Sequence, residues 1–152
     1  MAKFIYRMEN ILSLQIKLEN EAKIQLTLAN NILRIEQEKL RAIYDDIEEY
    51  EEKIRNFKNQ VLNIKELKRC NDAIAIKKME AEEKKKDIEA AKKNVDKAMK
   101  RLREAMVERK TQETLKEKAF EEFKREVNEE EKKEVDQIVS YQYNNGKEEG
   151  EL

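Results

Sequence analysis

The chain has 152 residues, of which 44% are charged and only 6% are aromatic, with no proline, tryptophan or histidine. Charge at this density, carried mostly by lysine and glutamate, is typical of long helices and coiled coils and not of a compact globule. Basic and acidic residues nearly balance at 33 and 34, so the net charge of −1 gives no general attraction to nucleic acid.

The residue types that most enzyme sites need are missing. Cys70 is the single cysteine and therefore cannot form an internal disulfide. Because the chain has no histidine, it also lacks a Cys/His pair and the usual zinc ligand sets. The only glycines are Gly146 and Gly150, so no glycine-rich nucleotide loop exists. Nothing resembles a signal peptide or an apolar membrane span. We expect a cytoplasmic non-enzyme with no catalytic residue, cofactor or metal and no role for Cys70.

The first predicted element is a helix over residues 4–66. Its apolar residues alternate steps of three and four, which is the heptad seam of a coiled coil. The seam comprises Leu40, Ile43, Ile47, Tyr50, Ile54, Phe57, Val61 and Ile64. The same frame continues back to Ile5 with some polar insertions. Further apolar residues lie off this frame: Ile11, Leu14, Ile16, Leu18, Ile24, Leu28, Ile32 and Ile35. This part of the helix therefore exposes more apolar surface than one partner covers.

The second predicted element is a helix over residues 74–142. The first frame fails beyond Ile64, and a new seam appears with a shifted phase. It comprises Ala81, Ile88, Ala91, Val95, Ala98, Leu102 and Ala105. Because Asn71 and Asp72 suit helix caps and turns, we expect the turn within residues 66–74.

A short connection makes the two helices antiparallel. The predicted fold class is therefore all-α, a long antiparallel two-helix coiled-coil hairpin over residues 1–143, followed by a disordered acidic tail over residues 144–152. A register in which facing positions sum to 145 places large residues against small ones and Glu36 against Arg109. A register summing to 138 is the alternative and places Leu40 beside Ala98.

Charge supports a hairpin over a parallel homodimer. Residues 36–52 carry eight acids and two bases, a net of −6, whereas residues 88–104 carry six bases and three acids, a net of +3. In the predicted hairpin these segments attract each other, whereas a parallel dimer would place the acidic segment against its own copy. Residues 53–110 carry nineteen bases against ten acids, but without stacking aromatics we interpret them as a solvated face with no nucleic-acid partner.

Two stretches of the sequence resemble the FliJ family of bacterial flagellar export proteins. The opening "FIYRMENILSLQIKLENEAKIQL" is similar to the start of the family, and "RLREAMVERKTQETLKEKAFEEF" is similar to its C-terminal signature, centred on Glu108, Arg109 and Lys110. The resemblance spans both predicted helices.

The resemblance implies a function. FliJ proteins are similar to the central stalk, the gamma subunit, of rotary ATPases, and their open end inserts into the hexameric export ATPase FliI. The family also contacts the cytoplasmic domain of the export gate protein FlhA and escorts the chaperones of late flagellar substrates. The resemblance further implies that the chain is monomeric when free and does not insert into the membrane. It also implies that the chain associates peripherally with the inner membrane through the export apparatus.

The resemblance also suggests site residues. At the open end, apolar and basic groups lie in a region otherwise rich in glutamate, and we expect them to bind the ATPase. They are Phe4, Ile5, Tyr6, Arg7, Ile11, Leu14, Arg109, Lys110, Leu115 and Phe120. Packing between the two helices is the competing explanation for the aromatic residues. For the export gate, Gln37 and Tyr44 are the nearest matches, although Arg41 and Glu48 depart from the family pattern.

Other classes of function use the same heptads. A generic coiled-coil scaffold would be dimeric or larger. A stalk of virulence-type secretion would share the hairpin, and a prefoldin-like holding chaperone would bind unfolded protein without an ATPase. The mass of the free chain and the identity of its cytoplasmic partners distinguish these alternatives.

Overall fold

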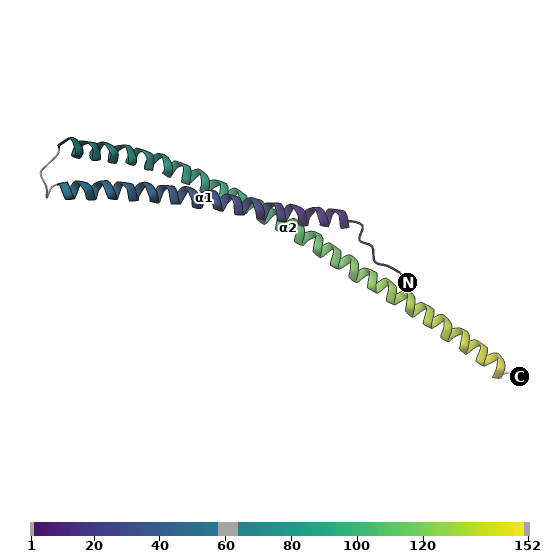
Figure 1. Cartoon of the computed structure of the whole chain (residues 1–152). Coiled ribbons are helices and arrows are strands. Elements are labelled where there is room, and N and C mark those ends of the chain that lie inside the picture. The colour runs from purple at the N-terminus through teal and green to yellow at the C-terminus, as the bar shows by residue number, and fades with distance from the viewer. Residues whose placement is uncertain (1, 58–63, 151–152) are drawn as a thin grey trace. The chain divides into compact units, whose positions relative to one another are not determined.

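The computed structural model describes residues 2–57 and 64–150 of the chain, and the side chains of residues 2–57 and 64–146. Its regular structure consists of α1, Glu9–Phe57, and α2, Ile64–Gly150, with no strand among the described residues (Figure 1). The fold is all-α, a hairpin of two long helices that pack together, which confirms the predicted fold class. Proline is absent, and Gly146 and Gly150 lie near the end of α2, so nothing interrupts either helix.

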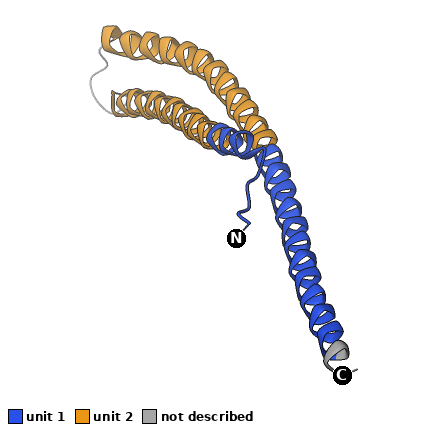
Figure 2. Cartoon of the chain, turned by 90° about the vertical axis from the view of Figure 1, so that its right-hand side faces the viewer, with its two compact units in different colours: residues 1–18, 106–152 blue, residues 19–105 orange. Residues whose placement is uncertain are grey.

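Two compact units divide the chain. Unit 1 comprises residues 1–18 and 106–152, and unit 2 comprises residues 19–105 (Figure 2). Each unit contains residues from both helices.

The seam of unit 2 follows the predicted heptads. On α1, Ile47 is buried and its neighbours in the frame are half-buried. On α2 the buried seam residues are Ala81, Ile88, Ala91 and Ala98. Small alanines alternating with larger side chains allow the two helices to approach closely. Of the apolar residues predicted to lie off the frame, all eight are exposed, four of them in this unit: Ile24, Leu28, Ile32 and Ile35.

The structure corrects the position of the turn. Residues 66–74, predicted to form it, lie inside α2, which begins at Ile64. Cys70 is buried there at 5% exposure, Ile74 is half-buried and Ala81 continues the stripe. Asn71 and Asp72 lower helix propensity by only a few tenths of a kcal/mol, about 0.7 at most, so the packing of this stripe outweighs it. The residues between the helices, 58–63, lie outside the described residues.

The predicted registers are also wrong. Lys84 Nζ lies 2.8 Å from Glu36 Oε2, and Lys77 Nζ lies 3.3 Å from Asp46 Oδ2. The residue numbers of these two pairs sum to 120 and 123, close to the 121 of the facing helix ends, Phe57 and Ile64. Because the register of a hairpin follows from where its helices end, an error in the turn displaces every pair. Glu36 therefore meets Lys84 and not Arg109.

In the observed register, the acidic segment 36–52 and the basic segment 88–104 do not face each other as predicted. In the observed register the acidic segment 36–52 faces residues 71–87, which carry five acids and five bases. The basic segment 88–104 faces residues 19–35, which carry two of each. Individual ion pairs join the helices, but the net charges of the two segments do not compensate each other.

Unit 1 differs from the prediction at both chain ends. The first helix was expected near residue 4 but begins at Glu9, where the Glu9 amide donates to the Tyr6 carbonyl oxygen at 3.3 Å. Residues 144–150, predicted as disordered, belong to α2, and residues 151–152 lie outside the described residues. Lysine and glutamate have high helix propensities, but Asn144, Asn145 and the two glycines disfavour a helix, so propensity does not explain why α2 continues through these residues. No side chain from 128 to 146 is buried.

Candidate functional site

Aromatic contacts hold the N-terminal segment of unit 1 against α2. The Phe4 ring lies 5.1 Å from the Phe120 ring, edge to face, and 5.4 Å from the Phe123 ring. Such pairs contribute about 0.5–1.5 kcal/mol each beyond the area they bury. Residues 4–8 precede α1, which begins at Glu9, and these ring contacts hold them on α2.

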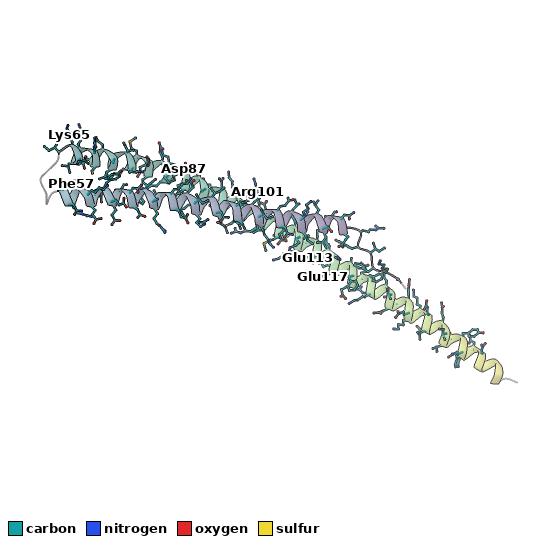
Figure 3. All side chains as sticks on the ribbon, viewed as in Figure 1. Phe57, Lys65, Asp87, Arg101, Glu113 and Glu117 are labelled. Carbon is teal, nitrogen blue, oxygen red and sulfur yellow. The ribbon has the colours of Figure 1, made fainter. Side chains whose placement is uncertain are left out.

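Two polar contacts support the same arrangement. The Tyr6 hydroxyl donates to Gln112 Oε1 at 3.1 Å, and Lys116 Nζ lies 2.9 Å from Glu9 Oε2. A groove of about 490 Å³ lies beside them, with Phe4, Leu12 and Phe120 among its lining residues. Figure 3 labels Glu113 and Glu117, which also line this groove. The segment is therefore fixed on α2 beside an apolar groove with acidic side chains.

The predicted ATPase-binding residues divide into two groups. Phe4 and Tyr6 are half-buried and hold the N-terminal segment, and half-buried Arg109 donates to Glu113 Oε2 at 2.8 Å. The other seven are exposed: Ile5, Arg7, Ile11, Leu14, Lys110, Leu115 and Phe120. Ile5 is the extreme case at 78% exposure. The structure thus brings the candidates into one unit but leaves only the second group mainly accessible to a partner.

Phe120 has a further contact that the sequence did not predict. Lys124 Nζ lies 4.7 Å from the centre of the Phe120 ring, at the spacing of one helical turn. A cation–π contact at an exposed site contributes about 0.5–1 kcal/mol. Phe120 is therefore packed on one side by Phe4 and covered in part by Lys124, and it remains 38% exposed.

The predicted gate residues lie in unit 2. Gln37 and Tyr44 are both exposed on α1 and are seven residues apart, so they share one helical face. A hydrogen bond to Glu82, and secondarily one to Tyr44, raises the pKa of the Lys85 ammonium group of α2. The structure places the two residues together and provides no further contact that assigns them a role.

Sequence reasoning missed a surface on the last part of α2. Between residues 128 and 146 the exposed apolar side chains are Val135, Ile138, Val139, Tyr141 and Tyr143. Ile138 and Tyr141 line a shallow groove of about 560 Å³ with Glu134. Four of the five already lie within the predicted helix 74–142, and their spacings of three and four are helical, so this surface could have been found from the sequence.

The described part of the chain contains no group of three or more cysteine, aspartate or glutamate side chains placed to hold a metal ion. None of its helices has both the length and the apolarity that a membrane crossing requires.

Comparison with known proteins identifies the family. The model of the family described as "Flagellar FliJ protein" matches residues 4–148. A solved structure of a YscO homologue, CT670 from Chlamydia trachomatis, has the same fold: its TM-score is 0.74 at 21% identity, over 96% of this chain and 99% of that one. No curated protein matches the sequence. Because the family model covers almost the whole chain, the protein belongs to the FliJ family of flagellar proteins, helical components of type III protein export.

Proposed function

We propose that the protein is a central stalk of the hexameric export ATPase FliI and links that ATPase to the cytoplasmic domain of the export gate FlhA. In this role it also escorts export chaperones, donates no catalytic group, and works in the cytoplasm at the inner membrane. Membership of the FliJ family supports the export role, and the arrangement of unit 1 supports the ATPase contact.

One observation carries the proposal. Unit 1 uses Phe4 and Tyr6 to fix its N-terminal segment on α2, yet it leaves Ile5 and Leu14 exposed, together with the basic Arg7. Neither Arg7 nor Lys110 forms an ion pair within the described residues. Arginine is enriched among the residues that dominate binding energy at protein interfaces, and exposed apolar side chains next to polar ones mark interaction sites.

Charge reversal at the two cations tests the ATPase contact. The double variant Arg7→Glu/Lys110→Glu should keep its helicity and melting temperature, because exposed charges contribute little to folding. It should not co-elute with purified FliI or stimulate ATP hydrolysis, and the defect should grow as salt is lowered.

A matched control makes the same charge change in unit 2. Lys78 and Lys86 are exposed on α2 and form no ion pair among the described residues, so Lys78→Glu/Lys86→Glu should bind and stimulate as the parent does. Equal behaviour of both double variants would refute the contact through Arg7 and Lys110.

The alternative functions predict different masses for the free protein and different binding partners. A stalk is a monomer when free, whereas a generic scaffold is dimeric or larger by sedimentation. A prefoldin-like chaperone would suppress aggregation of an unfolded protein without FliI, and a stalk of virulence-type secretion would prefer the ATPase of that system. A monomer that binds FliI and does not protect an unfolded client would support the proposed function over all three.

A further inference from the structure

Unit 2 contains a groove whose exposed apolar and basic side chains have no partner among the described residues of the hairpin. It has a volume of about 420 Å³ and lies between α1 and α2. Leu28, Ala29 and Ile32 of α1 line one side, and Asn94, Lys97 and Arg101 of α2 line the other. Arg101 is labelled in Figure 3. Gln25 also lines the α1 side, and the buried Ala91 and Ala98 also line the α2 side. The α1 side is otherwise apolar, whereas the exposed side chains of the α2 side are polar and basic.

The apolar side belongs to a stripe that runs along α1. Ile24, Leu28, Ile32 and Ile35 follow one another at steps of four, four and three, so they form one face of the helix. Leu28 and Ile32 are 50% and 55% exposed, and none of the four belongs to the seam with α2. A second apolar stripe beside the seam is the pattern of a helix that packs against two partners, of which this chain supplies one.

The basic side is not neutralised by the hairpin. Elsewhere in unit 2 the lysines that face α1 are paired, Lys84 with Glu36 and Lys77 with Asp46. Across the groove from Lys97 and Arg101, α1 offers Gln25 and the apolar stripe, with no acid. Neither Lys97 nor Arg101 forms a hydrogen bond or ion pair with any described residue.

We propose that this groove binds an amphipathic helix of another protein, whose apolar stripe is flanked by acidic residues. A third helix lying between two packed helices buries an apolar stripe with helical spacing, as recognition helices do in hydrophobic grooves. Acidic residues on its flank would pair with Lys97 and Arg101. The groove lies in unit 2, so the proposal does not depend on the ATPase contact proposed for unit 1.

The chemistry of the groove selects a protein helix over nucleic acid. Phosphates are bound by clusters of cations and by backbone amides, whereas the α1 side of this groove is formed by Leu28, Ala29 and Ile32. Bases are held by stacking on aromatic rings, and no aromatic residue lines it. An acidic amphipathic helix would cover the apolar side of the groove and pair with its two cations.

The test uses the full chain and a synthetic 18-residue helical peptide with leucine at helical spacing and glutamate on both flanks, labelled for fluorescence anisotropy. The peptide should bind the wild-type chain. Lys97→Glu/Arg101→Glu should weaken binding about tenfold or more, because like charges would then face each other. Leu28→Ser/Ile32→Ser should weaken it to a similar extent, because the apolar anchors are lost.

Matched controls separate the groove from general charge. Lys93 and Lys100 are exposed on α2 and do not line the groove; they are seven residues apart, whereas Lys97 and Arg101 are four apart. Lys93→Glu/Lys100→Glu makes the same charge change and should alter binding less than about twofold. A peptide with lysine in place of glutamate should bind more weakly than the acidic one. The replaced side chains are exposed, so all variants should melt with the parent.

Three results would overturn the proposal. The acidic peptide could fail to bind the wild-type chain, or it could bind the two groove variants as tightly as the parent. The wild-type chain could also form a concentration-dependent dimer in sedimentation that Leu28→Ser/Ile32→Ser abolishes, in which case a second copy covers the groove.

Discussion

Unit 1 and unit 2 are built from the same two helices, but different forces hold their segments together. In unit 2 a heptad seam with Ile47, Ile88 and Ala91 at its centre is buried along both helices, and ion pairs join them at its edge. In unit 1 the N-terminal segment is held by one aromatic cluster and two polar contacts, and α2 has no buried side chain from residue 128 to residue 146.

The difference suggests a division of labour. A continuous seam stabilises a helical pair along its whole length, because each layer supports the next. A segment held at one point can open without unfolding the rest, which is characteristic of regions that bind partners. We therefore expect stability to depend mainly on unit 2 and adaptable binding to depend mainly on unit 1.

The largest effect should come from a charge in the seam of unit 2. Ile47 is 7% exposed, so Ile47→Asp would bury a carboxylate without a partner and should cost about 3–5 kcal/mol. Thermal and urea unfolding, followed by circular dichroism, would measure the loss. Ile24→Asp is the control, because Ile24 is 59% exposed on the same helix and the change should stay within about 0.5 kcal/mol. Equal losses would contradict the assigned seam.

A smaller and local effect should follow from Phe4→Ala. Loss of the two ring contacts should lower the opening free energy of the N-terminal segment by about 1 kcal/mol, which speeds tryptic cleavage after Arg7 about fivefold. The main unfolding transition should hardly move. Ile5→Ala is the matched control, because Ile5 is exposed and has no such contact. A shift of the main transition by Phe4→Ala would show that unit 1 and unit 2 are not separable in this way.

The sequence predicted the seams more accurately than the turn for a physical reason. A heptad frame is a local property, and Ile47 and Ala98 reveal it by spacing alone. The turn depends on small differences, because Asn71 and Asp72 cost little within a packed helix. The register is the sum of two helix ends, so a modest error in the turn displaced Glu36 from Lys84 to Arg109.

The error in the register also limited how much of the candidate sites could be predicted from the sequence. Exposure of Leu28 and Ile32 could be predicted from their position off the frame, but the α2 residues beside them follow from the register, so the groove was missed. The sequence also did not show that some apolar residues of the open end are packed whereas others are exposed. Phe4 and Ile5 are adjacent and apolar, yet only Phe4 meets the rings of α2, which depends on where α1 begins.

A pH-dependent effect should identify the ion pair between the helices of unit 2. The hydrogen bond from Lys84 lowers the pKa of Glu36, and Lys39 lowers it further. A carboxylate with a lowered pKa stabilises the fold above the unfolded value of about 4.3, and the contribution disappears as pH falls through the folded pKa. The difference in melting temperature between wild type and Glu36→Gln should therefore be greatest near neutral pH and shrink below about pH 4.

A second pair provides the comparison for this experiment. Glu38 pairs with Arg34 at 2.8 Å, but both side chains are exposed on α1 and the pair does not join the helices. Glu38→Gln should change the melting temperature less at neutral pH. If the two variants behave alike, the pair between Glu36 and Lys84 contributes no more than an exposed pair on a single helix.

The smallest effect should come from removing residues 147–152. The last half-buried side chain of α2 is Val127, and every side chain from 128 to 146 is exposed. A Cβ built at Gly146 would meet nothing within 4 Å. Truncation after Gly146 therefore cuts the helix beyond a stretch whose side chains are all exposed, and the free energy of unfolding should change by less than about 0.5 kcal/mol. Co-elution with FliI should also be unchanged. A longer truncation, from Glu121 onward, is the contrasting variant because it removes Phe123 and should speed cleavage after Arg7 as Phe4→Ala does. If the short truncation alone abolished FliI binding while melting stayed constant, the end of α2 would belong to the binding surface, and the exposed apolar residues from Val135 to Tyr143 would become its nearest candidates.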